Sequence, residues 1–150
     1  MVASSSRRAL LVAVVVCLAV PASASASARH NRTEAGIVRA MNYVRTSHRL
    51  PPLAASALLA RAADQHSAAM LHSNRFGHGA FAQRVRHYVH SRLVGENLAW
   101  MRRCSAAAVV RLWLNSAAHR RIMLTPGFRR VGVARRASSR ICFVTADFAS

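Results

Sequence analysis

Apolar residues at helical spacing predict five helices along the chain. Ile37, Met41 and Val44 recur with the period of an amphipathic helix and predict a helix over residues 33–48, with Thr33 as its N-cap. The same pattern predicts further helices over residues 56–73, 82–89, 106–115 and 116–124. Proline or glycine residues separate several of these segments, which favours turns between the helices.

Two short apolar runs near the C-terminus predict β-strands. Residues 131–134 and 141–145 are rich in valine and other strand-favouring residues, and a polar stretch joins them. Helices followed by a small antiparallel sheet predict an α+β fold. Glu96, in contrast, is predicted to lie in a loop, because Gly95 and Asn97 flank it.

The first 28 residues have the order of a secretory signal peptide. A pair of arginines precedes an apolar run over residues 9–20, and a tract of alternating alanine and serine then ends at Ala28. This run is shorter than the roughly 20 residues that cross a bilayer, so a membrane anchor is less favoured. Cleavage between residues 24 and 28 would leave a single domain, 29–150 at its shortest, without a transmembrane segment. We therefore expect a secreted, extracellular protein.

The charge of the chain is strongly positive. It contains 22 basic residues, all of them arginine, and only 4 acidic residues, which gives a net charge of +18. Such a charge attracts anionic cell-wall polymers and lipid head groups, and it binds nucleic acid only non-specifically. The arginine content can also reflect codon usage in a GC-rich genome, because the arginines are scattered over the whole chain. Adhesion to polyanions at low salt is expected in either case.

Two cysteines, Cys104 and Cys142, lie beyond the predicted signal peptide. An even number of cysteines in an exported chain favours a disulfide bond. A bond between these two would stabilise the fold by roughly 4 kcal/mol, because it restricts the unfolded chain. The alternative is a pair of separate, buried thiols.

Few residues can carry chemistry, because the sequence holds only 4 side-chain carboxylates. Glu96 stands out among them, and its candidate partners are His78, in a turn with a glycine on each side, and His119, at the edge of a predicted helix. Two imidazoles and a carboxylate can hold Zn²⁺ with an open coordination position, or they can act as general acid and base. The spacing of the three residues matches no local metal motif, so the residues alone leave their grouping open. His66, on the apolar face of its helix, is expected to be a hydrogen-bonded core histidine.

Six short motifs follow one another along the chain, and their order carries more information than any one of them. They are His66-Ser67-x-x-Met70, Phe76-x-His78, Gly95-Glu96-Asn97-Leu98-Ala99, Val110-x-x-Trp113-x-Asn115-Ser116-x-x-His119-Arg120-x-x-Met123-Leu124, Phe128-x-x-Val131-Gly132-Val133-Ala134 and Phe143-Val144-Thr145-Ala146-Asp147-Phe148-Ala149. This set resembles the bacterial branch of the CAP superfamily, named after cysteine-rich secretory proteins, antigen 5 and pathogenesis-related plant proteins. The resemblance to this domain, also called the SCP domain, covers about residues 33–149.

The resemblance implies a three-layer α-β-α sandwich with an open cleft. At the matching positions, His78, Glu96 and His119 would line that cleft and hold zinc or another divalent cation. Asn97, Ser116 and Arg120 would also lie at the cleft. Asn97 would tie backbone through its amide, and Ser116 would cap the turn that carries His119. Arg120 would either form an ion pair with Glu96 or remain solvated.

The sequence departs from the family pattern at two positions, and both departures weaken the case for catalysis. Residues 115–118 lack the acidic side chain that animal and plant relatives place before the second histidine, and Ala146 replaces a polar residue in the last strand. The favoured function is therefore a secreted, monomeric binding module for a lipid, a sterol, another small ligand or an anionic cell-wall ligand. A cationic wall-adhesion or antimicrobial protein is the alternative, and a metal-assisted hydrolase is less favoured. We therefore expect a binding protein more than an enzyme.

Overall fold

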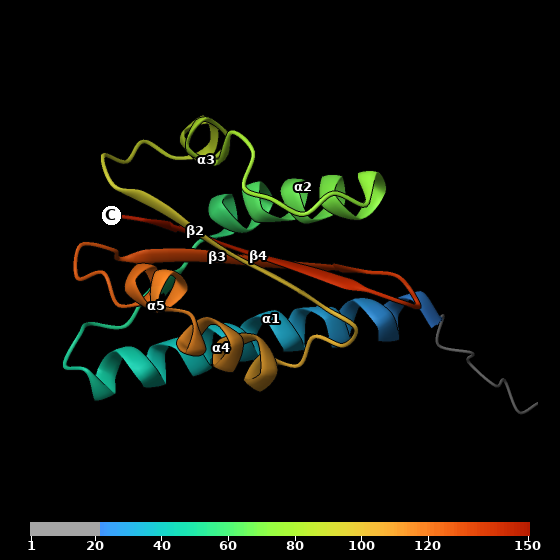
Figure 1. Ribbon diagram of the computed structural model, residues 1–150, viewed down its shortest axis with the longest axis horizontal. Helices are drawn as coiled ribbons and strands as arrows, with labels where there is room; N and C mark the ends of the chain where they lie inside the picture. The colour runs from blue at the N-terminus through green and yellow to red at the C-terminus, as the bar shows by residue number, and fades with distance from the viewer. Residues whose placement is uncertain (1–21) are drawn as a thin grey trace, which may run out of the picture.

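The computed structural model describes the backbone of residues 22–150 and the side chains from Arg32 onward. Most of the predicted signal peptide, residues 1–21, lies outside the described residues, so that interpretation stays a prediction. Helices and strands form three layers (Figure 1). One helical layer contains α1 (Ala22–Ser47), α4 (Ala106–Asn115) and α5 (Ala117–Met123), and the other contains α2 (Ala57–Ser73) and α3 (Phe81–Tyr88). The sheet between them contains β1 (Ala54–Ala55), β2 (Val94–Met101), β3 (Arg130–Ala137) and β4 (Cys142–Ala149). This arrangement confirms the predicted α+β sandwich.

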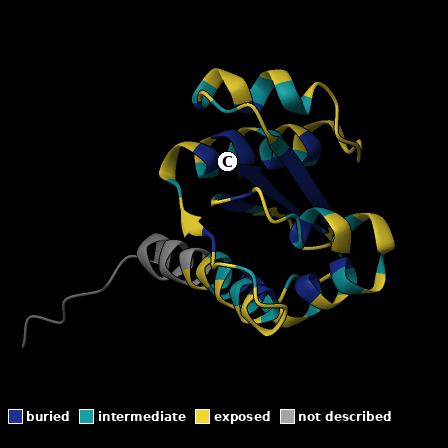
Figure 2. Cartoon of the chain, turned by 90° about the vertical axis from the view of Figure 1, so that its left-hand side faces the viewer, coloured by how far each residue is buried: buried dark blue, intermediate teal, exposed yellow. Residues whose placement is uncertain are grey.

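The sheet is mixed, with the strand order β1-β3-β4-β2. β1 pairs in parallel with β3, whereas β4 pairs antiparallel with both β3 and β2. Every residue of the central strand β4 is buried, and Figure 2 shows this strand layer in dark blue between the helices. β2 lies at the edge of the sheet, and its register places Glu96 opposite Asp147 of β4.

The prediction of a loop around Glu96 is wrong, because this segment is strand β2. Gly95 has the look of a turn signal in the sequence, but it lies against an aromatic side chain. A Cβ atom at Gly95 would come within 2.7 Å of the Phe128 ring. Glycine at this position therefore permits a close approach between the strand and Phe128. Such a close approach, and not only a turn, can require glycine inside a strand.

The helices largely agree with the pattern of apolar residues. α2 begins one residue after Ser56, whose hydroxyl accepts a hydrogen bond from the backbone N–H of Leu59 at 3.4 Å. The bounds of α4 agree with the predicted helix. The N-cap assigned to Thr33 is wrong, because α1 begins at Ala22 and Thr33 lies inside it. Among residues 22–150, no helix combines the length and hydrophobicity needed to span a bilayer.

The main hydrophobic core lies between the sheet and the layer of α1 and α4. It includes Ile37 and Met41 from α1, Trp113 from α4 and Phe148 from β4, all fully buried. These residues confirm that the apolar stripe of the first helix faces the core. The indole N–H of Trp113 donates to the carbonyl of Leu98 at 2.8 Å, so the polar atom of this core residue is satisfied.

Arg45, near the end of α1, has no solvent exposure. Its guanidinium donates to four backbone carbonyls, at distances from 2.8 to 3.2 Å. These carbonyls belong to Pro51, Met123, Thr125 and Phe128. Burial lowers the pKa of Arg45, and the positive charge of Arg129 lowers it further. One side chain thereby fastens the end of α1 to the end of α5 and to the turn before β3.

The predicted disulfide between Cys104 and Cys142 is present, with a Cα–Cα distance of 6.2 Å. It connects the segment after β2 to the first residue of β4. The bond therefore stabilises the end of the β2–β4 pair that lies away from Glu96. The alternative of two separate thiols is therefore wrong.

Candidate functional site

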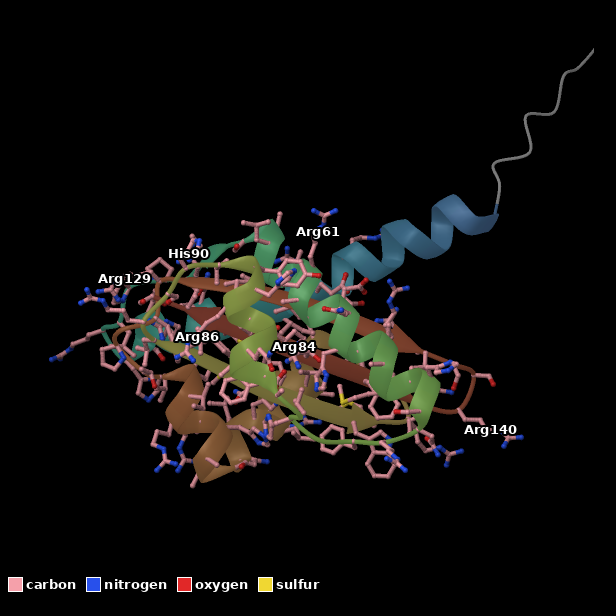
Figure 3. All side chains as sticks on the ribbon, turned by 90° about the horizontal axis from the view of Figure 1, so that it is seen from above. Arg61, Arg84, Arg86, His90, Arg129 and Arg140 are labelled. Carbon is pink, nitrogen blue, oxygen red and sulfur yellow. A yellow bond between two sulfur atoms is a disulfide. The ribbon has the colours of Figure 1, made fainter. Side chains whose placement is uncertain are left out.

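Two buried carboxylates face each other across neighbouring strands. Glu96 of β2 is paired with Asp147 of β4, and their exposed fractions are 4% and 0%. Arg84, from α3, reaches down onto both, as its position over the sheet in Figure 3 indicates. Its Nη2 atom donates to Glu96 Oε2 and lies 3.6 Å from Asp147 Oδ1. A single guanidinium thus serves as the cation for two carboxyl groups.

The surroundings keep one of these carboxyl groups protonated near neutral pH. Burial raises the pKa of Glu96 to about 7, although the charge of Arg84 opposes the shift. Burial and then the negative charge of Glu96 raise the pKa of Asp147 to about 8. In its ionised form, neither oxygen of Asp147 would find a hydrogen-bond donor among the described residues. A protonated Asp147 can instead donate to Glu96, and Arg84 then balances the one remaining negative charge.

Two histidines border the carboxylate pair. His78, in the loop between α2 and α3, is bonded through Nδ1 to Glu96 Oε1 at 2.8 Å, and its side chain is 52% exposed. With the Nδ1–H donating to the carboxylate, the Nε2 atom of the neutral ring remains an acceptor. Burial lowers the pKa of His119, and a charge on the nearby His78 lowers it further. The Nδ1 atom of His119 is buried and has no hydrogen-bond partner among the described residues.

The structure brings two of the three predicted metal ligands into direct contact, namely His78 and Glu96. His119 lies close enough to His78 for electrostatic influence. As the residues lie, Glu96 has no free oxygen for a metal ion, because His78 and Arg84 already engage both of its oxygens. Among the side chains of residues 32–150, no three His, Cys, Asp or Glu are grouped as metal ligands. Metal binding by His78, Glu96 and His119 therefore stays a prediction.

Among the other predicted cleft residues, Asn97 binds backbone through its side-chain amide, as predicted. Its amide donates to the carbonyl of His119 at 3.0 Å, which holds the helix α5 against the strand β2. Ser116 stands at the N-cap position of α5, but its side chain makes no capping hydrogen bond, so that detail is wrong. Arg120 is exposed and donates to the carbonyl of Leu114 at 2.7 Å, so it is not the partner of Glu96. Whether these residues contact a ligand stays a prediction.

Sequence reasoning missed Arg84 and did not group Asp147 with Glu96. Asp147 had one signal, because it is among only 4 acidic residues in the chain. Its place opposite Glu96 depends on strand register, which could not be read from a segment predicted to be a loop. Arg84 carried no signal at all, since it is one of 22 arginines.

His66 adds a further polar contact at this site. Its Nε2 atom donates to the carbonyl of Gly77 at 2.8 Å and lies 3.9 Å from Glu96 Oε2. The predicted hydrogen bond is thus confirmed, but the predicted place in the core is wrong, because His66 is only half-buried and lines a pocket. A pocket of about 430 Å³ opens beside it between α2 and α3, with Gln65, Gln83 and Arg84 in its lining. Two residues that lie against Glu96, namely His66 and Arg84, therefore border this pocket.

The geometry allows proton transfer and ligand binding. Glu96 orients the ring of His78, so that the exposed Nε2 atom can accept a proton or a hydrogen bond. Asp147 and Glu96 together hold one exchangeable proton near neutral pH.

Comparison with known proteins identifies the family. The model of the CAP family, described as the cysteine-rich secretory protein family, matches residues 38–148. The chain therefore belongs to the CAP family. No curated protein matches the sequence significantly.

Solved structures agree with this assignment. An extracellular protein containing an SCP domain from Bacillus anthracis is 31% identical over 80% of this chain, with a TM-score of 0.72. The match spans only 41% of that longer protein. An outer surface protein from Borrelia burgdorferi is 22% identical over 76% of this chain and 89% of its own, with a TM-score of 0.69. A structure of NaASP2 with Zn²⁺ is 14% identical over 77% of this chain and 78% of its own, with a TM-score of 0.62. The latter two likenesses concern the fold alone.

Proposed function

We propose that the chain is a secreted binding module whose ligand site comprises His78, Glu96 and His119. The observation that carries this proposal is a buried nitrogen for which the described part of the chain provides no partner, on a histidine that lies near the exposed His78. His78 leaves Nε2 as an acceptor, and Nδ1 of His119 is buried without a hydrogen bond among the described residues. Buried polar atoms in native proteins normally have a partner, so a ligand or water is expected here. An extracellular location is supported by relatives named as extracellular or outer-surface proteins.

Two occupants fit these acceptors. One is a small or lipid-like ligand with a hydrogen-bond donor, such as the hydroxyl group of a sterol. The other is a divalent cation such as Zn²⁺, the ion with which the structure of NaASP2 was solved. A cation would be held by His78 and His119, and Glu96 could join only if Arg84 released it. Arg84 is thus expected to weaken metal binding at this site.

The test uses two probes, Zn²⁺ and vesicles of neutral lipid that contain cholesterol. Binding is measured on the wild type, on His78→Ala and His119→Ala, and on His48→Ala as a control for an exposed histidine just after α1. We expect at least one probe to bind the wild type and the control equally, and to bind both site variants at least about tenfold more weakly. If neither probe depends on His78 or His119, the proposed ligand site is wrong.

For the metal, Arg84→Met sharpens the test. Removal of the guanidinium frees Glu96, so zinc is expected to bind this variant at least about tenfold more tightly than the wild type. The gain should disappear when His78→Ala is added. If zinc binds equally weakly to all the variants, the proposal that a divalent cation occupies this site is wrong.

A second candidate function is adhesion to polyanions, and the burial of acidic side chains favours it. Glu96 and Asp147 are buried, and Asp64 is paired with Arg136 at 2.6 Å. Little negative charge is left to balance the arginines that spread over the face in Figure 3. Binding to an anionic polymer should then fall about tenfold or more between low and physiological salt. Binding that persists at high salt would argue for a specific site instead.

A further inference from the structure

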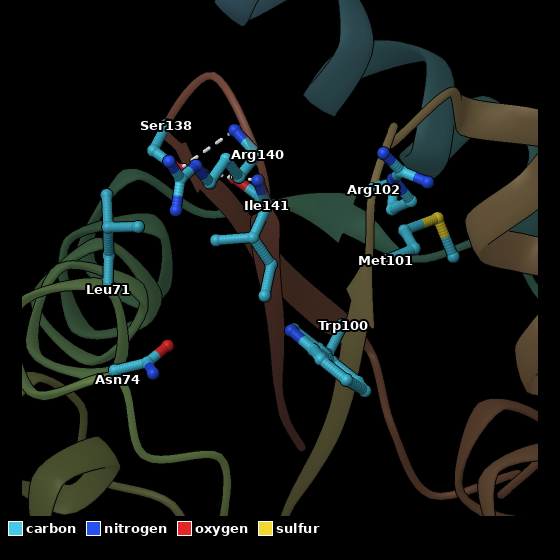
Figure 4. Close-up of a pocket in the computed structure, with 8 residues that line it drawn as sticks. All are labelled: Leu71, Asn74, Trp100, Met101, Arg102, Ser138, Arg140 and Ile141. Carbon is cyan, nitrogen blue, oxygen red and sulfur yellow. Dashed lines mark hydrogen bonds between the residues drawn. The ribbon is translucent and has the colours of Figure 1, made fainter.

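A second hollow lies at the opposite end of β2 from Glu96. It is a pocket of about 720 Å³ between the end of α2, the end of β2 and the hairpin that joins β3 to β4. Figure 4 shows Leu71 and Asn74 on one side, Trp100 on the other and Ile141 between them. Its volume falls in the range of about 300–1,000 Å³ that is usual for sites of small molecules.

The indole of Trp100 makes one wall of this pocket. Trp100 is 56% exposed although it belongs to a strand whose preceding five residues are buried. Its ring centroid lies 6.5 Å from that of Phe76, and Phe76 lies 6.3 Å from Phe143. The exposed face of the Trp100 indole, with the exposed ring of Phe76 beside it at an angle of 37°, offers an apolar surface on which another ring can stack.

Arginines border the same pocket. Arg102 and Arg140 line it, and both continue into an adjoining hollow of about 520 Å³ that Arg103 also lines. The 4 acidic residues of the chain lie elsewhere. Two are buried beneath α3, Asp64 is paired with Arg136, and Glu34 bonds the backbone N–H of Arg135 at 2.8 Å. Within residues 32–150, no carboxylate therefore neutralises the three arginines, and an anion would find charged donors there.

A third pocket is also lined by arginines, but it lacks the aromatic residues found at the pocket of Trp100. Arg86 and Arg92 line a pocket of about 420 Å³ beside α3, together with His90 and Val89. That pocket has the arginines but neither Trp100 nor Phe76. It offers charge without the aromatic wall, so it is a matched control within the same molecule.

We propose that the pocket of Trp100, Arg102 and Arg140 binds a small organic anion with a flat, apolar ring. The ring would stack on Trp100, and the carboxylate, sulfonate or phosphate group would be bound by Arg102 and Arg140. This site is separate from His78, Glu96 and His119, so it does not depend on the function proposed for them.

The test uses the fluorescent probe anilinonaphthalene sulfonate, which carries an aromatic body and an anionic group, on the full chain. Binding to the wild type is compared with Trp100→Ala and with the double variant Arg102→Ala/Arg140→Ala. Each should bind the probe about tenfold more weakly. Trp100→Phe keeps an aromatic ring and should retain most of the affinity. The altered residues are largely exposed, so thermal unfolding should show that the variants remain folded.

The matched control is Arg86→Ala/Arg92→Ala, which removes the same charge at the hollow that has neither Trp100 nor Phe76. It should bind the probe within about twofold of the wild type. Equal loss in both double variants would mean attraction by net charge alone and would overturn the proposal. The uncharged probe phenylnaphthylamine should bind the wild type about tenfold more weakly than the sulfonate. If it binds as tightly, the anionic part of the proposal is wrong.

Discussion

Two arginines inside this fold hold separate parts of it together, and they are neutralised in different ways. Arg45 donates only to backbone carbonyls, which supply partial charges from four places in the chain. Arg84 lies against two carboxylates that are buried themselves. The first arrangement has no partner that titrates, whereas the second contains a proton that leaves near neutral pH. Arg45 therefore has a structural role, whereas Arg84 also sets the protonation of the two carboxyl groups at the candidate site.

The largest effect is expected at Arg45. Arg45→Met would remove four hydrogen bonds to backbone carbonyls, two of them buried, and should lower the free energy of unfolding by about 4 kcal/mol. The loss should be nearly independent of pH between 6 and 8, because carbonyls do not titrate. Denaturant unfolding measures it, with Arg39→Met on the exposed face of α1 as control. A loss as small as that of the control would contradict the structural role of Arg45.

A smaller and pH-dependent effect is expected at Arg84. Arg84→Met removes the one cation beside two buried carboxyl groups and should cost about 3 kcal/mol at pH 8. The cost should shrink at pH 6, because Glu96 and Asp147 can then both take a proton and lose their charge. Unfolding of Arg84→Met and of the exposed control Arg86→Met at the two pH values tests this. A loss that is the same at both values would mean that Arg84 acts like Arg45.

The wild type should also become less stable as the pH rises from about 6.5 to about 8. The pKa values of Glu96 and Asp147 are raised in the fold, so the folded state binds more protons than the unfolded state in this window. Stability is therefore lost as the pH rises through the folded values, at up to about 1.4 kcal/mol per pH unit and proton. Asp147→Asn should flatten this slope. Glu34, with a pKa raised to about 7, leaves a residual slope.

His66 and His119 change the stability with pH in the opposite direction, and they do so at lower pH. Burial lowers the pKa values of His66 and His119, so their contribution is lost as the pH falls below about 6.5. A slope above pH 6.5 that Asp147→Asn leaves unchanged would show that the buried pair does not titrate there.

The smallest effect is expected at Arg120, which the sequence offered as a partner of Glu96. Its exposed guanidinium is bonded to the carbonyl of Leu114. Arg120→Met should therefore change stability by no more than about 0.5 kcal/mol, without pH dependence. A pH-dependent loss like that of Arg84→Met would restore Arg120 as the cation of the site.

Most of the architecture could be predicted from the sequence, because helices and buried strands have their own periodic patterns. The bounds of α2 and α4 followed from apolar spacing, and in the structure the hydroxyls of Ser56 and Ser105 cap these two helices. The segment around Glu96 could not be assigned, because the glycine that looks like a turn signal is needed for contact with Phe128.

The candidate site was predicted in part. The order of motifs pointed to His78 and Glu96, which are in contact. The role of Arg84 depends on how α3 packs over β2 and β4, and composition hides one arginine among 22. Strand register, which is a tertiary property, brought Asp147 opposite Glu96.

Arg84 and one shared proton together balance the charge of the two buried carboxylates. The most direct test follows the carboxyl carbon NMR signals against pH, which is practical because the chain has only 4 acidic side chains. In the wild type, Glu96 and Asp147 should titrate near 7 and 8, and both pKa values should rise further in Arg84→Met. Titration of both groups near pH 4, or values that Arg84→Met leaves unchanged, would contradict this charge balance.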